Sequence, residues 1–312
     1  MEHNLAIGVD IGGSHISSMA VGLSSGTLYR ETLSGNYVDN QEQAFRIVSS
    51  WASCIRETMG KIPAGSTLKG IGFAMPGPFD YVRGIALFRG VPKFENLYGF
   101  NIADAMRSSL DLNDDFRLRF INDATSFALG EAWAGGASGA KRMAAITLGT
   151  GFGSAFIADR VPVADGPLVP GLGCLYHLPF REGIADDYFS TRWFRIRYLE
   201  LTGKDVEGVR ELLAESGSDP VVSSLFTEFG RNLGIFLAPW LKRFDAEVLV
   251  TGGNISRAWN LFGGDLTQTL AGEGCNTRVV VSAFGEDAAL LGSAFLFNEE
   301  LWPDIEKTLH LM

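Results

Sequence analysis

Residues 5–22 read LAIGVDIGGSHISSMAVG, and this stretch predicts a hairpin of two strands. Residues 5–10 form an apolar run of strand length, Gly12 and Gly13 supply a tight turn, and residues 16–22 alternate hydrophobic with small side chains. A dinucleotide-binding turn or a P-loop would run from its strand directly into a helix, and a P-loop would also contain Gly-Lys-Ser/Thr. The strand-like continuation argues against both motifs, and therefore against a pyridine-nucleotide oxidoreductase.

The turn of this hairpin is a candidate phosphate-binding site. The backbone amides of Gly12, Gly13 and Ser14 are spaced to form an anion-binding concavity. The carboxylate of Asp10 would repel a phosphate unless a cation lay between them, so Asp10 indicates Mg²⁺, held through water. A Gly-Gly hairpin with an acidic strand end explains the same residues, and this stretch alone does not separate the two interpretations.

The same pattern begins again in the second half of the chain. Residues 143–148 predict a strand, residues 149–153 read GTGFG, and residues 154–158 predict a second strand. As a hairpin, this turn is suited to bind the other side of the same polyphosphate through Thr150 and Gly151. Two similar starts roughly 140 residues apart predict two related α/β lobes.

Asp123 follows the predicted strand at residues 116–121 and precedes a predicted helix at residues 124–134. Open α/β sheets bind ligands at the carboxyl ends of their strands, where a carboxylate can act as general base in phosphoryl transfer. In that interpretation Asp123 accepts the proton of an attacking hydroxyl, and Asn122 orients the hydroxyl. The structural alternative is that Asp123 is a simple N-cap.

The remaining sequence predicts further elements of an α/β fold. A helix is expected after Asp39 and Glu42, which are spaced as a capping box. The strand at residues 68–74 ends in the rigid turn Met75-Pro76-Gly77-Pro78. Further helices are predicted near residues 184–199, at 225–244 and from Gly285 onward, with strands at 247–250 and 278–281. In the helix at 225–244, residues at helical spacing are expected to pack in a core: Leu225, Phe229, Leu233, Phe236 and Trp240.

Two other places carry polar or glycine patterns that suit a ligand. Gly252 and Gly253 follow a buried strand and would let the flat ring of a nucleoside lie against the backbone, although an ordinary strand–helix turn explains them equally well. His177 and Asp186 lie in a glycine-rich, irregular region. Because no cysteine lies between them, a zinc site is not expected there, and we expect both side chains to contact a sugar hydroxyl.

Composition limits the classes of function. The 312 residues are 46% hydrophobic and 20% charged, which is typical of a globular protein and not of a disordered one. The net charge of −10 disfavours a nucleic-acid partner. Three widely spaced cysteines (Cys54, Cys174 and Cys275) argue against a disulfide framework. With no signal peptide and no membrane-length apolar segment, a cytoplasmic protein without a membrane partner is expected.

Taken together, the motifs resemble those of the ROK family of sugar kinases and related repressors, in the actin-like ATPase superfamily. The resemblance covers nearly the whole chain. DIGGS at residues 10–14 is similar to the first phosphate motif, MPGP at 75–78 to the Pro-Gly-Pro turn, and NDA at 122–124 to the motif with the catalytic aspartate. LGTG at 148–151 resembles the second phosphate motif, and Gly252-Gly253 the adenosine motif.

The resemblance implies an α/β, ribonuclease H-like fold of two lobes around a ligand cleft, with Mg²⁺-ATP and a hexose or N-acetylhexosamine as ligands. Asp123 would take the proton from the sugar hydroxyl, commonly the one on carbon six, and Gly77 and Asn122 would contact the sugar. The first lobe would comprise residues 1–123 with the last helix and tail at 292–312, and the second would comprise 124–291. Homodimers are common in this family.

The sequence departs from the family pattern in its sugar-binding region. The family has Gly-Glu-x-Gly-His, whereas this chain has Gly-Cys-Leu-Tyr-His at residues 173–177, so His177 is retained and Cys174 replaces the glutamate. The cysteine-rich zinc motif is absent, and Asp186 is a candidate replacement for its final glutamate. These changes affect the expected choice of sugar more than the kinase chemistry.

Two other functions fit the same family. A non-catalytic sugar sensor would explain Cys174, Tyr176 and the missing zinc motif, and it differs from a kinase in ATP turnover. A DNA-binding repressor would need a helix-turn-helix before the first motif, but the first predicted strand begins near Leu5. The retained Asp10, Asp123 and Thr150 favour the kinase.

Overall fold

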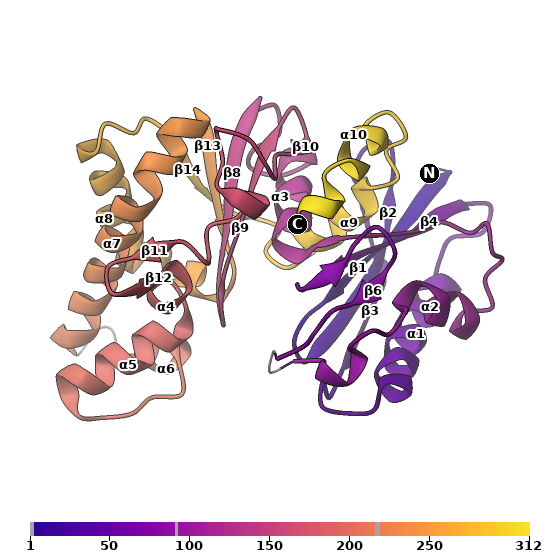
Figure 1. Cartoon of the computed structure of the whole chain (residues 1–312), viewed down its shortest axis with the longest axis horizontal. Helices are drawn as coiled ribbons and strands as arrows, with labels where there is room; N and C mark the ends of the chain where they lie inside the picture. The colour runs from indigo at the N-terminus through magenta and orange to yellow at the C-terminus, as the bar shows by residue number, and fades with distance from the viewer. Residues whose placement is uncertain (1–2, 91–92, 216–218) are drawn as a thin grey trace. The chain divides into compact units, whose positions relative to one another are not determined.

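A computed structural model describes residues 3–90, 93–215 and 219–312. Contacts between residues divide the chain into two compact units. The first comprises Met1–Ser138, Arg160–Pro162 and Glu286–Met312, and the second comprises Gly139–Asp159 and Val163–Gly285. Each unit is built around a mixed β-sheet (Figure 1).

The first unit has a five-stranded sheet in the order β3-β2-β1-β4-β7, in which β1, β4 and β7 are parallel. Helix α1 packs against β2 and β3, whereas α9 packs against β1 and β4 (Figure 1). The elements of this unit are β1 (Asn4–Ile11), β2 (His15–Gly22), β3 (Leu28–Tyr37), α1 (Ala44–Gly60), β4 (Thr67–Met75), β5 (Phe79–Asp80), β6 (Ile85–Ala86), η1 (Glu95–Leu97), α2 (Ile102–Ser109), β7 (Leu118–Asn122), α3 (Asp123–Trp133), β10 (Val161–Pro162), α9 (Asp287–Phe295), α10 (Trp302–Glu306) and η4 (Leu309–Leu311).

Both predicted hairpins are confirmed. Strands β1 and β2 pair antiparallel from Leu5↔Gly22 to Ile11↔Ile16, so the chain turns back at Gly12–Ser14 without entering a helix. In the second unit, β8 and β9 pair in the same way from Arg142↔Ala158 to Leu148↔Phe152. The alternation of side chains that predicted these strands is local, which is why the sequence alone revealed them.

Helix α9 lies unusually close to its neighbours because glycines remove the side chains between them. A Cβ atom on Gly8 of β1 would overlap the Leu290 carbonyl group, and one on Gly72 of β4 would overlap that of Ser293. Between α3 and α9, Gly130 faces the Ala288 carbonyl and Gly292 faces that of Ser126. Glycine is therefore required at these positions by backbone contact rather than by a turn.

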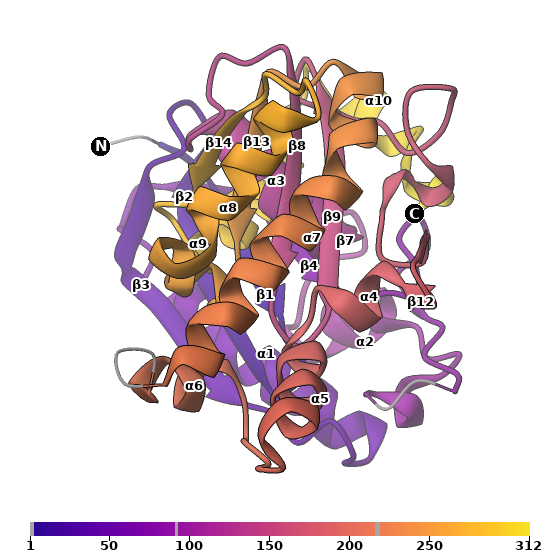
Figure 2. The ribbon, with the colours of Figure 1, turned by 90° about the vertical axis from the view of Figure 1, so that its left-hand side faces the viewer.

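The second unit has four main strands in the order β9-β8-β13-β14, with β13 parallel to both β8 and β14. Figure 2 shows the long helix α7 and helix α8 side by side across this sheet. The elements are β8 (Arg142–Leu148), β9 (Phe152–Ala158), η2 (Gly171–Gly173), β11 (Pro179–Phe180), β12 (Gly183–Ile184), α4 (Ala185–Tyr188), α5 (Thr191–Thr202), α6 (Val209–Glu215), α7 (Pro220–Phe244), β13 (Val248–Gly252), η3 (Asn254–Ala258), α8 (Trp259–Gly272) and β14 (Arg278–Val281).

The predicted core face of α7 is confirmed. Leu225, Phe229, Leu233 and Phe236 are buried, and Trp240 packs partly buried against the same cluster. Aromatic rings dominate this core: the ring of Phe229 contacts four others, those of Phe189, Trp193, Phe194 and Phe262. The ring of Phe189 also contacts that of Phe236. Burial of rings of this size stabilises the unit by roughly 1.5–3 kcal/mol each before entropy is counted.

Three predictions about helices were wrong. Asp39 and Glu42 do not form a capping box, because α1 begins at Ala44 and the Asp39 carboxylate accepts from the Gln41 amide instead. The helix expected near residues 184–199 is two helices, α4 and α5, separated at Phe189 and Ser190. The chain from Gly285 onward was expected to form one final helix, whereas α9 ends at Phe295 and α10 follows at Trp302–Glu306.

The contact-based units differ from the boundaries expected at residues 123 and 291. Helices α3 and α9 both lie wholly within the first unit, which ends at Ser138 and resumes at Glu286. The physical reason is the glycine-mediated packing of α9 on β1, β4 and α3, which joins these elements into one body.

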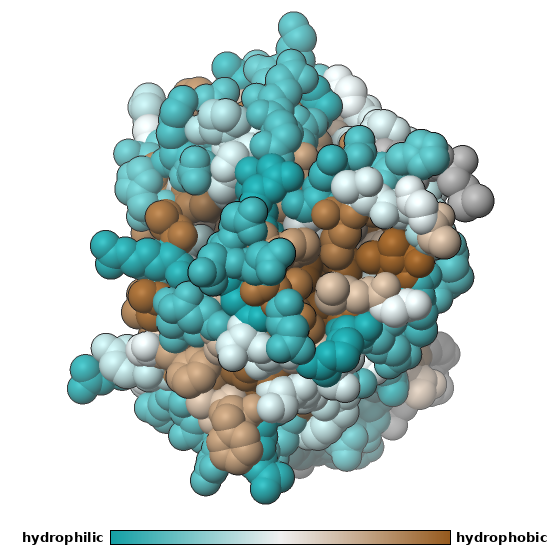
Figure 3. Space-filling view, turned by 90° about the vertical axis from the view of Figure 1, so that its right-hand side faces the viewer, coloured by the Kyte–Doolittle hydropathy of each residue, from teal (hydrophilic) through white to brown (hydrophobic). Residues whose placement is uncertain are grey.

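The face of the molecule in Figure 3 is mostly hydrophilic, with separate apolar patches among the polar side chains. Among the described residues, the most exposed large hydrophobic side chains are Tyr37 (78% exposed) and Phe45 (59%). No helix in the described ranges is long and apolar enough to cross a membrane.

Candidate functional site

The first unit brings three of the predicted motifs to one edge of its sheet. Because β1, β4 and β7 are parallel neighbours, their carboxyl ends lie in a row. Asp10 pairs with Ala74 at the end of β4, and Met75 pairs with Asn122 at the end of β7. The DIGGS turn, the Pro-Gly-Pro turn and the Asn-Asp motif therefore meet here.

Asn122, not Asp123, is the N-cap of α3. The Asn122 side-chain oxygen accepts from the Thr125 amide at 3.1 Å, so the simple N-cap interpretation of Asp123 was wrong. One carboxylate oxygen of Asp123, Oδ1, accepts from the Ala124 amide at 2.8 Å and from Asn122 Nδ2 at 3.0 Å. Its other oxygen, Oδ2, accepts no hydrogen bond from any residue that the structure describes. Asp123 thus has one fixed oxygen and one available to a ligand.

Tyr81 supports this motif from the neighbouring segment. Asn122 Nδ2 donates to the Tyr81 hydroxyl at 3.3 Å, and that hydroxyl donates to the Met75 carbonyl at 3.2 Å. Gly77 lies beside the same hydroxyl, since a Cβ there would be 3.5 Å from it, and the Gly77–Pro78 peptide bond is cis. The side chain of Asn122 is thus held between α3, Asp123 and Tyr81.

The electrostatics of this edge favour protonated carboxyl groups. Burial, together with the charges of Asp123 and Glu286, raises the pKa of Asp10 to about 7. Burial also raises the pKa of Asp123, although the hydrogen bonds from Ala124 and Asn122 and the charge of Lys93 oppose that shift. When ionised, Asp123 and Glu286 repel the Asp10 carboxylate, which adds to the cost of its burial.

The residues present fit a magnesium ion bound through water rather than directly. No group of three or more His, Cys, Asp or Glu residues in the described part of the chain is placed to hold a metal. Asp10 nevertheless carries a carboxylate whose pKa is raised by burial and by neighbouring negative charge, and a cation near it would offset both effects. Asp10 is the residue that would hold such an ion.

The turn after β1 has two backbone amides that face no internal partner. The Gly12 amide donates to the His15 carbonyl at 2.9 Å and closes the turn, while the Ser14 carbonyl accepts from the Val38 amide at 2.9 Å. Over the described residues, the amides of Gly13 and Ser14 donate to no acceptor. Two neighbouring amides without an acceptor are what an anion-binding concavity requires, so the phosphate-binding hypothesis for this turn stays a prediction.

The second unit presents its own glycine turn between β8 and β9. The Gly149 amide donates to the Gly151 carbonyl at 3.1 Å, and the Gly149 carbonyl accepts from the Thr191 amide at 2.8 Å and the Thr191 hydroxyl at 2.9 Å. Thr150 and Gly151 are exposed at the tip. Hydrogen bonds from Thr191 therefore hold the turn at Gly149, while the two predicted ligand residues, Thr150 and Gly151, remain accessible.

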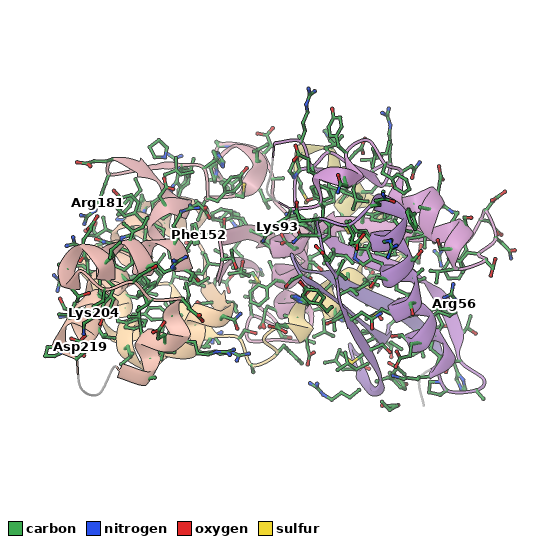
Figure 4. All side chains as sticks on the ribbon, turned by 90° about the horizontal axis from the view of Figure 1, so that it is seen from below. Arg56, Lys93, Phe152, Arg181, Lys204 and Asp219 are labelled. Atoms are coloured by element: carbon green, nitrogen blue, oxygen red, sulfur yellow. The ribbon has the colours of Figure 1, made fainter. Side chains whose placement is uncertain are left out.

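Asp186 supports this turn. Its Oδ1 accepts from the amide of Phe152 (labelled in Figure 4) at 2.7 Å, and its Oδ2 pairs with Arg192 at 2.9 Å. A Cβ on Gly151 would lie 3.0 Å from Oδ1, so glycine there lets the carboxylate approach. Sequence reasoning expected Asp186 to contact a sugar, but both of its oxygens are engaged within the protein.

Tyr176 connects the segment that carries His177 to Asp186. The Asp186 amide donates to the Tyr176 carbonyl at 3.0 Å, and the rings of Tyr176 and His177 are 5.2 Å apart. On its other side, His177 Nδ1 is 3.8 Å from the Cys174 sulfur. Burial raises the pKa of Cys174 to about 11, so this thiol stays neutral. The loop therefore presents a neutral thiol and an imidazole together.

Gly252 and Gly253 have a structural reason to be glycine. Gly252 is buried in β13 opposite Thr147 of β8. Gly253 has a φ of +83°, and a Cβ there would overlap the Leu148 carbonyl. This contact places the strand–helix turn directly beside the start of the glycine turn at 149–151, and Gly253 itself is exposed.

Two residues of the first unit were missed by sequence reasoning. Tyr81 is an ordinary aromatic residue after the Pro-Gly-Pro turn, and only its contacts with Met75 and Asn122 reveal its place. Lys93 lies in the segment between β6 and η1, yet its charge acts on Asp123. A single tyrosine or lysine in an irregular segment gives no local signal, whereas proximity in the fold does.

Comparison with known proteins gives one consistent result. The model of the ROK family matches residues 6–300. The chain is 25% identical to a glucokinase of Thermotoga maritima, covering 95% of this chain and 98% of the glucokinase. It is 26% identical to a beta-glucoside kinase of Klebsiella pneumoniae, covering 93% and 95% respectively.

Solved structures agree on the fold. A ROK family glucokinase from Streptomyces griseus, determined with glucose and AMPPNP, superposes with a TM-score of 0.71 at 23% identity, covering 94% of this chain and 98% of that one. The predicted α/β fold of two units, which this ROK family structure shares, is thereby confirmed.

Proposed function

The chain belongs to the ROK family, and from this membership we propose that it is a sugar kinase. The proposed reaction transfers the γ-phosphoryl group of ATP to a hydroxyl, commonly O6, of a hexose or N-acetylhexosamine. The observation that carries the proposal is the carboxylate of Asp123, which is fixed through Oδ1 and open at Oδ2, beside a turn with two unpartnered amides.

Asp123 acts as the general base. Its Oδ2 accepts the proton of the sugar hydroxyl as the oxygen attacks the γ-phosphorus, and the bond from phosphorus to the β-phosphate oxygen breaks. Burial raises the pKa of Asp123 and so strengthens it as a base. Asn122 and Tyr81 act on the reaction by holding this carboxylate in place.

The phosphates of ATP are assigned to the two glycine turns. In the first unit, the Gly13 and Ser14 amides donate to phosphate oxygens, with Gly12 closing the turn. In the second unit, Thr150 and Gly151 are the proposed phosphate contacts, and Gly252 and Gly253 form the proposed adenosine contact. Magnesium, when bound through Asp10, supplies positive charge that offsets the charge of the phosphates.

The sugar is assigned to the Asn-Asp edge and to His177. Because His177 Nδ1 faces Cys174, its Nε2 is the atom available to a sugar hydroxyl. Asp186 is proposed to orient the sugar-binding loop through Tyr176 while it supports the glycine turn. A neutral thiol at Cys174 cannot accept a strong hydrogen bond as a carboxylate would, which predicts an altered preference among sugars.

A non-catalytic sugar sensor is the second candidate, and Cys174 in place of the family glutamate favours it. The kinase and the sensor differ in one measurement. We would assay ADP release with Mg²⁺-ATP over a panel of hexoses and N-acetylhexosamines, with Asp123→Asn as control. Turnover with one sugar that falls by about 10²- to 10⁴-fold in Asp123→Asn supports the kinase. Sugar binding by calorimetry without any turnover supports the sensor instead.

A further inference from the structure

Lys93 lies against the turn that is proposed to bind phosphate. Its side chain, labelled in Figure 4, comes from the segment between β6 and η1. A Cβ atom built on Gly13 would be 2.8 Å from Lys93 Nζ and 2.8 Å from its Cε. The missing side chain at Gly13 therefore lets the ammonium group approach the backbone whose amide has no acceptor.

The next residue fixes Lys93 in this position. Phe94 is fully buried, in edge contact with Trp51 at 5.5 Å, and its φ of +58° lies in the left-handed region that costs a phenylalanine energy. The Phe94 amide donates to the Asn40 carbonyl at 3.2 Å, and the Asn40 side-chain amide donates to the Gly13 carbonyl. The lysine segment and the turn are thus joined through one asparagine.

The charge of Lys93 has no fixed partner. Among the residues that the structure describes, no carboxylate forms an ion pair with it. Its field reaches Asp123, whose pKa it lowers. The Lys93 ammonium group thus lies beside two amides without acceptors and acts electrostatically on the proposed base. This arrangement is suited to bind an anionic group held between the glycine turn and Asp123.

We propose that Lys93 is a catalytic residue that contacts the transferred phosphoryl group, an assignment that rests on the proposed kinase function. As the sugar oxygen bonds to phosphorus and the bond to the ADP oxygen breaks, the proton passes to Asp123 and the electron pair leaves with ADP. Lys93 donates a hydrogen bond to a non-bridging oxygen of the phosphoryl group, together with the Gly13 and Ser14 amides.

The test compares Lys93→Met, Lys93→Arg and a matched control, Lys307→Met, which removes an exposed lysine of the same unit that pairs with Asp304. Steady-state kinetics give kcat and both KM values for each variant. Calorimetry with inorganic phosphate, without metal or nucleotide, measures the anion site independently of turnover. Thermal unfolding confirms that each variant is folded.

We expect kcat to fall by about 10²- to 10³-fold in Lys93→Met, with both KM values within about threefold, and a smaller fall in Lys93→Arg. Phosphate affinity should fall about tenfold in Lys93→Met, while Lys307→Met matches the wild type in both assays. A kcat within threefold of wild type overturns the proposal, as does unchanged phosphate affinity. If the wild type shows no turnover, the kinase function fails, and loss of phosphate affinity in Lys93→Met then still supports the anion contact.

Discussion

At the scale of single residues, the pair Asn122 and Asp123 divides two tasks that one residue cannot perform together. Asn122 caps the helix, which leaves the carboxylate of Asp123 with an open oxygen. The amide of Asn122 also donates to Asp123 and to Tyr81. An asparagine is suited to this place because it has both an acceptor for the cap and donors for its neighbours.

Replacement of Asn122 separates these tasks. Asn122→Ser retains a good capping oxygen but loses the donors to Asp123, whereas Asn122→Ala loses both. We expect about a tenfold lower kcat in both variants, and a fall of about 1 kcal/mol in the free energy of unfolding only in Asn122→Ala. Urea unfolding beside ADP-release kinetics measures the two effects. Equal stability losses in the two variants would contradict the division of roles.

Asp10 should make stability depend on pH. Its pKa of about 7 in the folded protein lies above the ordinary value of 3.8, so the unfolded chain releases this proton first as pH rises. The group therefore destabilises the fold progressively between about pH 4 and pH 7, by up to about 4 kcal/mol. We expect Asp10→Asn to be more stable than wild type at pH 8 and equal to it near pH 4.

Urea unfolding of both proteins at the two pH values measures this difference. A difference in stability that is the same at pH 4 and pH 8 would show that burial and the charges of Asp123 and Glu286 do not raise the pKa of Asp10.

Sequence reasoning found the residues of the site that lie in motifs and missed those that do not. Asp10 lies near the end of the apolar strand β1 and Asp123 directly follows β7, so their positions at strand ends could be read locally. Lys93 reaches Gly13 only because Phe94 is anchored in a core formed by distant segments. Similarly, the engagement of Asp186 with Phe152 and Arg192 depends on packing between elements.

At the scale of elements, helix α9 is defined by what it contacts rather than by its own sequence. Nearly all of its residues are buried, so it lacks the one-sided apolar pattern from which helix limits are estimated. The strands of both hairpins alternate visibly, and they were predicted well. The long-range backbone contacts at Gly8, Gly72, Gly130 and Gly292 produce no pattern in the neighbouring sequence from which they could be predicted.

Gly130 tests this packing. Alanine is normally the better helix former by about 1 kcal/mol, but a Cβ on Gly130 would overlap the Ala288 carbonyl of α9. We expect Gly130→Ala to destabilise the fold by roughly 1–3 kcal/mol or more, because backbone cannot move aside as a side chain would. In α8, Gly264 is exposed with no atom within 4 Å of its Cβ position, so Gly264→Ala should stabilise by about 0.5–1 kcal/mol.

Chemical denaturation of both variants gives the comparison. If Gly130→Ala were as stable as Gly264→Ala, the close approach of α3 and α9 would have to be rejected.

At the scale of the whole molecule, the first unit is assembled from both ends of the chain. Its sheet lies before Ser138, and helix α9 comes from the segment after Gly285. The Val9 amide in the middle of β1 donates to the Ser293 hydroxyl at 3.1 Å, which ties the two ends together. Removal of the C-terminal segment should therefore affect the N-terminal strand.

A chain that stops at Gly285 tests this dependence. We expect the amides of β1 and β4 to lose most of their protection from hydrogen exchange, because the face of the sheet under α9 is uncovered. Protection in β8 and β13, which belong to the second unit, should persist to a greater extent. A truncated chain in which β1 keeps full protection would contradict the assembly described here.

Because α9 is encoded long after β1, the strand is synthesised well before the helix that covers it. Strand β1 leaves the ribosome early, but the helix that covers it is made roughly 280 residues later, which at 5–20 residues per second takes roughly 15–60 s. During that interval a glycine-lined, apolar surface of β1 and β4 is exposed to the cell. Until α9 is made, this surface is therefore prone to aggregation and available to chaperones.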